Sequence, residues 1–166
     1  SRSNTALATV GSTGVVTGVA SGVVNISYTL ATGCTAVTPV TVNVAPNLSS
    51  FIVSSASSTC IGGGSTVTVS STSIGSGTYT STYDLSGANS STGNTAVMSI
   101  GISGGAFNIP STALTIAGAT TVTVTSVTNS IGCNITLSTG NTANFNVNAL
   151  PTVFAVTGGG SYCAGG

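Results

Sequence analysis

The chain has 166 residues, of which one is basic and one is acidic, and it contains no histidine. General acid–base catalysis needs a titratable side chain beside the reacting proton, and most metal sites need several His, Cys, Asp or Glu side chains that converge on one point. Arg2 and Asp84 alone meet neither requirement. The composition therefore predicts a protein that is not an enzyme and that uses no cofactor or metal ion.

The low charge also restricts the partners that the chain can bind. Nucleic-acid binding depends on Lys and Arg side chains that neutralise phosphates, and a polybasic membrane contact needs the same residues. No stretch reaches the roughly 18 apolar residues of a membrane span. We therefore expect neither nucleic-acid binding nor membrane insertion. A surface with almost no net charge tends to associate, which suits a fibre better than a soluble monomer.

The residue types predict an all-β chain. Thr and Val favour strands, Gly and Asn favour turns, and the strong helix formers Glu, Lys, Gln and Arg are almost absent. The first predicted strands are ATV at 8–10, GVVTGV at 14–19 and GVVNISYTL at 22–30, joined by Gly turns. A further strand-rich stretch, VTVNVAP, follows at 40–46.

The rest of the chain alternates apolar and polar residues, as strands with one buried face do. Seven or so short strands at this spacing favour a two-sheet sandwich. The alternative is a β-solenoid, which would need a repeat of roughly 20 residues, and none is visible. The predicted strands lie at 50–56, 65–71, 77–85, 94–102, 105–110, 120–128, 133–138 and 142–148.

An internal repeat organises the chain. Phe51 precedes Cys60 by nine positions, and Phe154 precedes Cys163 by the same number. Each of these cysteines begins a Cys-x-Gly-Gly turn. Glycine at such positions is typical of tight turns, so the two segments are predicted to open two modules in the same way.

A second landmark gives a similar period. The Gly-Cys dipeptide at 33–34 recurs at 132–133, and both copies lead to an Asn-Val segment and a Pro. The matched cysteines are therefore 103 and 99 positions apart, close to the length of an immunoglobulin-like sandwich. We expect the back of one module at 1–45, a complete module at 46–149 and the opening strand of a third at 150–166. The chain would then be an excerpt of a longer protein or the repeating unit of a polymer.

Residues 4–44 closely resemble the second half of a group 2 bacterial immunoglobulin-like domain. The specific part is the pattern A-T-V-x-x-x-G-V-V-T-G-V-x-x-G, which runs from Ala8 to Gly22. The middle module, with GTYTSTYDLSGANSSTGNTAVMSI and TTVTVTSVTNSIGCN, looks like repeats of giant surface proteins from Bacteroidota-type bacteria, and so does the end, TVFAVTGGGSYCAGG.

This resemblance implies immunoglobulin-like β-sandwiches in tandem, with partial modules at both ends of the chain. It also implies an extracellular or cell-surface setting, since such proteins are very long and exported, often by a type IX secretion route. They serve in adhesion, gliding or extracellular matrix. The resemblance supplies no active site. Calcium between modules is not expected, because this chain lacks the carboxylates that would bind it.

The four cysteines are predicted to be structural. Cys60 and Cys133 bracket one module, so we expect a disulfide between them, which loop closure would make worth about 4 kcal/mol. Cys34 and Cys163 would then bond to a neighbouring module or protomer. One alternative is free buried thiols in a reducing compartment. Another is a zinc site, but the nearest two cysteines are 26 positions apart, and structural zinc sites use closely spaced pairs.

Two tyrosines are candidates for a ligand platform. Tyr79 and Tyr83 are four positions apart and share one strand face, where they could bind a sugar or, alternatively, pack at the sheet edge or in the core. Arg2 and Asp84 are candidates for an ion pair between protomers, although an exposed pair contributes little. Four glycosylation sequons are expected by chance in so much Asn, Ser and Thr: Asn25, Asn47, Asn89 and Asn134.

The sequence therefore favours a structural repeat of an extracellular filament or giant cell-surface adhesin, without catalysis. Its partners would be copies of itself or adjacent modules of the same chain. A route for assembly is strand complementation, in which the opening strand at 150–157 completes the front module of the next copy. The alternative is a glycan- or ice-binding module of a secreted surface protein, with Tyr79 and Tyr83 on the glycan-binding face.

Overall fold

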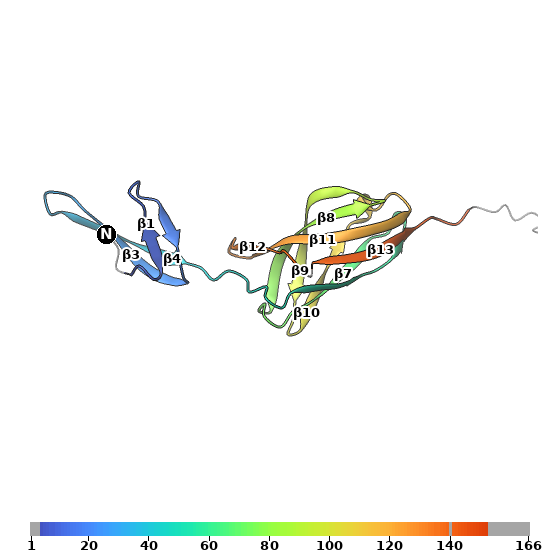
Figure 1. Ribbon diagram of the computed structural model, residues 1–166, viewed down its shortest axis with the longest axis horizontal. Coiled ribbons are helices and arrows are strands. Elements are labelled where there is room, and N and C mark those ends of the chain that lie inside the picture. Colours follow the sequence, from blue (N-terminus) through green and yellow to red (C-terminus); the bar gives the residue numbers. More distant parts are fainter. Residues whose placement is uncertain (1–3, 140, 153–166) are drawn as a thin grey trace, which may run out of the picture.

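A computed structural model describes residues 4–139 and 141–152 of the chain (Figure 1). Its regular structure is all β apart from one short 3-10 turn, η1 (Ser111–Ala113). Two separately hydrogen-bonded parts follow one another along the chain. Two small hairpins lie within residues 4–42, and a nine-stranded sheet is formed by residues 52–148.

The N-terminal part consists of two antiparallel pairs. Strand β1 (Ala8–Val10) pairs with β2 (Val16–Gly18), and β3 (Gly22–Thr29) pairs with β4 (Thr35–Val42). The two hairpins approach each other closely at Gly18, where an added Cβ would lie only 2.8 Å from Val42 Cγ1. The only buried hydrophobic residues of this part that the structure describes are Ala8 and Val24.

The larger sheet runs in the order β5-β7-β10-β9-β8-β11-β13-β6, and β12 pairs with β11 beside it. All pairings are antiparallel except that of β13 with β6. The strands are β5 (Ile52–Ala56), β6 (Thr59–Cys60), β7 (Ser65–Ser70), β8 (Gly77–Gly87), β9 (Ser91–Ile100), β10 (Gly104–Ile109), β11 (Gly118–Asn129), β12 (Asn134–Thr136) and β13 (Thr142–Asn148).

Alternation in the sequence decides which face of each strand is buried. In β7, Val67 and Val69 are buried, while the Thr and Ser residues that follow each of them are exposed. In β11, the register with β8 shifts between Val124 and Ser126. Such a bulge inserts one extra residue and changes the direction of the side chains beyond it. Val124 and Val127 are therefore both buried, although they are three positions apart and simple alternation would place them on opposite faces.

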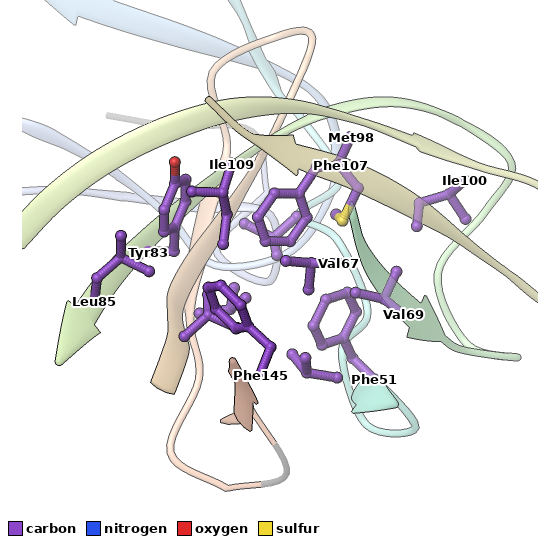
Figure 2. Packing of buried hydrophobic residues seen from close by; sticks show 14 of the residues in the cluster. Phe51, Val67, Val69, Tyr83, Leu85, Met98, Ile100, Phe107, Ile109 and Phe145 are labelled. Atoms are coloured by element: carbon purple, nitrogen blue, oxygen red, sulfur yellow. The ribbon is translucent and has the colours of Figure 1, made fainter. Parts of the chain in front are cut away.

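The sheet curls around one hydrophobic core. Strands β5 and β13 are far apart in the hydrogen-bonded order but contact each other. Figure 2 shows side chains from both halves of the sheet pointing into the same interior, among them the rings of Phe51, Tyr83, Phe107 and Phe145. The rings of Tyr83 and Phe107 have centroids 5.3 Å apart and are tilted by 36°, a favourable aromatic arrangement.

The all-β prediction is confirmed, and the curled sheet is consistent with a β-sandwich. Each strand predicted between residues 50 and 148 has a counterpart, and the one at 142–148 has the predicted bounds. The strand predicted at 133–138 is shorter, Asn134–Thr136, and β6 and η1 were not predicted. The solenoid alternative is wrong for residues 52–148, because antiparallel neighbours build a single curled sheet there.

Candidate functional site

The predicted disulfide between Cys60 and Cys133 is wrong, and both residues carry free thiols. Cys60 is the strand partner of Asn148 in the β6–β13 pair, which lies beside the Gly118 end of β11. Cys133 lies at the other end of β11, where its carbonyl accepts a hydrogen bond from Asn129 N. Strand β11 has 12 residues, and at about 3.3 Å per residue its ends are more than about 30 Å apart. A disulfide needs Cα atoms within about 7 Å.

Of the other two cysteines, only Cys34 lies in the part of the chain that the structure describes. Cys34 is an exposed free thiol in the turn between β3 and β4. Cys163 lies outside the described residues, so its predicted bond to a neighbouring module or protomer stays a prediction. No group of three or more His, Cys, Asp or Glu side chains that could hold a metal ion occurs among the described residues.

The predicted platform of Tyr79 and Tyr83 lacks one of its two rings. The two residues lie on β8 and both contact the core of the larger sheet, and Tyr83 is only 1% exposed. Burial raises the pKa of the Tyr83 phenol. Tyr79 is half-buried, and its hydroxyl donates a 2.8 Å hydrogen bond to Gly75 O. The prediction of a sugar-binding face is therefore wrong for Tyr83, and the alternative of core packing holds.

The single acidic side chain has a local structural role. Asp84 Oδ1 accepts a 2.7 Å hydrogen bond from Gly93 N in the strand β9 that pairs with β8. Gly93 has a φ of +67°, in the region that glycine adopts most readily. Asp84 therefore holds the beginning of β9 against β8. Arg2 lies outside the described residues, so the ion pair predicted between Arg2 and Asp84 stays a prediction.

A buried amide organises the loop that precedes β11. Asn89 is 4% exposed, and its Nδ2 donates to Ile116 O and Thr120 Oγ1, both at 2.9 Å. Its Oδ1 accepts from Thr115 N and Ile116 N, both at 3.0 Å. These four bonds use the full donor capacity and both acceptor positions of the amide. Asn89 is therefore a structural residue, although its sequon alone gave no reason to single it out.

A hollow of about 440 Å³ lies beside Asn89. Polar and small side chains line it, including Asn94, Thr112 and Ala113, and no charged group is among them. It is open to solvent and is not built around a convergent set of donors or acceptors. We therefore assign no ligand to this hollow.

Hydrogen bonds tie residues 43–51, the linker between the two parts, onto the larger sheet. Ser50 Oγ accepts from Thr72 N and Ser73 N, both at 2.9 Å. Ser73 Oγ donates to Asn47 O at 2.9 Å. Sequence reasoning missed this network, although the run of hydroxyl residues at 70–73 is the signal that could have drawn attention to it.

The same segment is bonded again nearer its start. Asn129 Nδ2 donates to Val44 O at 3.0 Å, and Asn129 Oδ1 accepts from the backbone N–H groups of Ile131 and Cys133. Asn129 thus joins the end of β11, the turn that follows it and the linker in one cluster. Hydrogen bonds of this kind restrict the linker more than its sequence alone would suggest.

The turns of the two parts have the same backbone structure. In the β3–β4 turn, Leu30 N donates to Cys34 O and Gly33 N donates to Leu30 O. In the β11–β12 turn, Asn129 N donates to Cys133 O and Gly132 N donates to Asn129 O. Both glycines have a φ of +86°.

The strands beside these turns also keep the same register. Three cross-strand pairs of β3–β4 have counterparts at positions higher by 99 in β11–β12. For example, the pair Tyr28–Ala36 corresponds to Val127–Ile135. The repeat that the Gly-Cys dipeptides indicated is therefore a repeat of hairpin structure as well as of sequence.

The two hairpins differ in what covers them. Val127 is completely buried, whereas Tyr28 at the equivalent position is 67% exposed. Ala36 is exposed and Ile135 is half-buried. We call the side of β3–β4 that bears Ile26, Tyr28 and Ala36 the open face.

No protein-family model matches the chain, and comparisons with curated proteins and with solved structures found no match. Within the part of the chain that the structure describes, no helix is long and apolar enough to cross a membrane.

Proposed function

We propose that this chain is a structural repeat of an extracellular filament or giant cell-surface adhesin, without catalysis. The observation that carries the proposal is the repeated hairpin, in which β3–β4 and β11–β12 share turn hydrogen bonds, a glycine φ and register. A protein built from a structural unit that recurs about every 100 residues is suited to forming a long fibre or stalk. The low charge of the chain also supports the proposal, because a neutral surface favours association.

The modules of the proposal are immunoglobulin-like sandwiches in tandem. In that fold the strands are ordered A-B-E-D in one sheet and C-F-G in the other. The order β5-β7-β10-β9 followed by β8-β11-β13 supports this assignment, if β5 is strand A and β13 is strand G. Here the pairing of β9 with β8 joins the two halves into one curled sheet. The partners in this proposal are adjacent modules or copies of the chain.

Glycan or ice binding has no observation in its favour. The ring of Tyr83 is in the core, so the aromatic face that the glycan hypothesis required is absent at Tyr79 and Tyr83. We therefore retain the structural repeat as the one proposed function.

Immunoelectron microscopy tests the proposal directly. Antibodies raised against the folded chain would be applied to intact cells that produce the protein and, separately, to permeabilised cells. We expect label on the outer surface or along filaments of intact cells, with a spacing that reflects the repeat. Label that occurs only after permeabilisation would contradict the proposal.

A further inference from the structure

The open face is an incomplete hydrophobic surface. Side chains alternate along a strand, so Val24, Ile26 and Tyr28 point to the same side of β3. The first is buried, the second is half-buried and the third is exposed. A hollow of about 520 Å³ next to Ile26 and Tyr28 and a smaller one of about 190 Å³ next to Tyr28 and Ala36 adjoin this side. Exposed apolar surface of this kind is typical of interaction sites.

The larger sheet shows what covers the equivalent face. There, the matched pair is Val127 and Ile135, and Val127 belongs to the same core cluster as Phe51. Leu48, Phe51 and Ile135 line a common hollow of about 340 Å³. The segment that starts at Pro46 and leads into β5 therefore contributes to this cover, because its Leu48 and Phe51 lie at the same hollow as Ile135 of the hairpin.

The chain contains a second segment of this type. Residues 151–156, PTVFAV, repeat the proline, the phenylalanine and the apolar residues of residues 46–53, and Phe154 precedes its Cys-x-Gly-Gly motif by the same nine positions as Phe51. The sequence thus provides one open hairpin face and, separately, one additional covering segment.

The covering segment cannot reach the open face of its own chain. Val147 pairs with Gly118 at one end of the 12-residue strand β11, and Asn129 at the other end holds Val44 of the linker to the hairpins. These ends are more than about 30 Å apart. The seven residues from Val147 to Phe154 extend at most about 25 Å. Figure 1 agrees, since β13 leads away from the side on which the hairpins lie.

We propose that the open face binds residues 151–156 of a second copy of this chain, with Phe154 packed against Tyr28 and Ile26. This inference rests on the proposed function and names the surface through which the copies join. Because the face and the segment are different surfaces, the contact is head-to-tail and does not close by itself, so it generates an open filament. The occupant lacks charged residues, in keeping with a neutral, apolar contact.

Sedimentation velocity of the full chain at increasing concentration tests the proposal with two variants. Tyr28→Glu places a charge on the open face, and Phe154→Glu places one on the segment. Matched controls are Val23→Glu, exposed on the opposite side of the same strand, and Leu150→Glu, exposed just before the segment. We expect the wild-type chain and both controls to form a concentration-dependent series of oligomers and each variant alone to stay monomeric.

Mixing the two variants provides the decisive result. In the mixture, the Phe154→Glu chain has an intact open face and the Tyr28→Glu chain has an intact segment 151–156. We therefore expect dimers and no larger species. A wild-type chain that is monomeric throughout, or a mixture that stays monomeric, would overturn the inference. Association that Tyr28→Glu abolishes but Phe154→Glu leaves intact would show a different occupant and would also overturn it.

These results are separable from those for the proposed function. Surface or filament labelling of cells does not depend on which residues join the copies. Label on the surface together with a monomeric wild-type chain would leave the structural role standing and remove the head-to-tail contact. Label confined to permeabilised cells would remove the proposed function itself.

Discussion

The hairpin β3–β4 and the hairpin β11–β12 have the same turn and the same register but different surroundings. The first contributes Val24 to a small contact between two hairpins, while the second contributes Val127 to the core of a nine-stranded sheet. The comparison shows that the local sequence is sufficient for the turn and the pairing. Burial of the apolar face requires strands that come from elsewhere.

The largest expected effect is at the matched positions themselves. Val127→Asp places an unpaired charge in the core, and we expect it to lower the free energy of unfolding by more than about 4 kcal/mol. Tyr28→Asp changes an exposed position, and we expect a change within about 0.5 kcal/mol. Urea denaturation followed by circular dichroism would measure both. Similar losses for the two variants would break the comparison between covered and open hairpins.

The next effect concerns the buried amide before β11. Asn89→Ala removes four hydrogen bonds and leaves the buried Thr120 hydroxyl without the amide that donates to it, so we expect a loss of about 2–3 kcal/mol in the free energy of unfolding. Asn134→Ala is the matched control, because its amide donates to Ser126 Oγ and Thr128 Oγ1 from an exposed position. We expect the control to lose less than about 1 kcal/mol. Equal losses would show that burial of Asn89 is not what matters.

The burial of Tyr83 should also appear in the pH dependence of stability. Burial raises the pKa of Tyr83 in the folded chain above its usual value of 10.0. The folded state therefore favours the neutral phenol, and its contribution is complete below pH 10 and is lost as the pH rises through the raised value. We expect Tyr83→Phe to reduce this alkaline loss of stability. Thermal unfolding from pH 8 to pH 11 would test this, and identical profiles for the wild-type chain and the variant would contradict it.

The smallest expected effect is that of a reducing agent. Cys34 and Cys133 occupy matched positions in the two hairpins, and both are free, as is Cys60. We therefore expect the unfolding temperature of the larger sheet to be the same with and without dithiothreitol. Cys60→Ser should change the free energy of unfolding by no more than about 0.5 kcal/mol. A loss of several kcal/mol on reduction would show that a disulfide stabilises the sheet after all.

Periodicity made the strands predictable, whereas contacts between distant residues were not. The alternation in STVTVS indicates which residues of β7 face inward, because it is a property of neighbouring positions. The Cys60–Cys133 pairing was inferred from a matched spacing, which carries no information about which end of a strand each residue occupies. That Tyr79 and Tyr83 share one strand face was likewise predictable from their spacing, but whether other strands would cover that face was not.

The order of residues by itself determined the all-β character and the alternation of inward and outward side chains, because these depend on backbone preferences and on patterns over a few positions. The repeat near 100 residues was likewise visible in the matched Gly-Cys dipeptides, although the turns that they form were not predicted. Tertiary structure alone decided that Tyr83 is in the core, that Asn89 holds a loop with all of its amide bonds, and that Tyr28 is exposed while Val127 is buried. The physical reason is that burial depends on the surface that another segment supplies. Residues 22–42 have the alternation of a strand pair with one buried face. Within the described chain, no other segment covers that face at Tyr28.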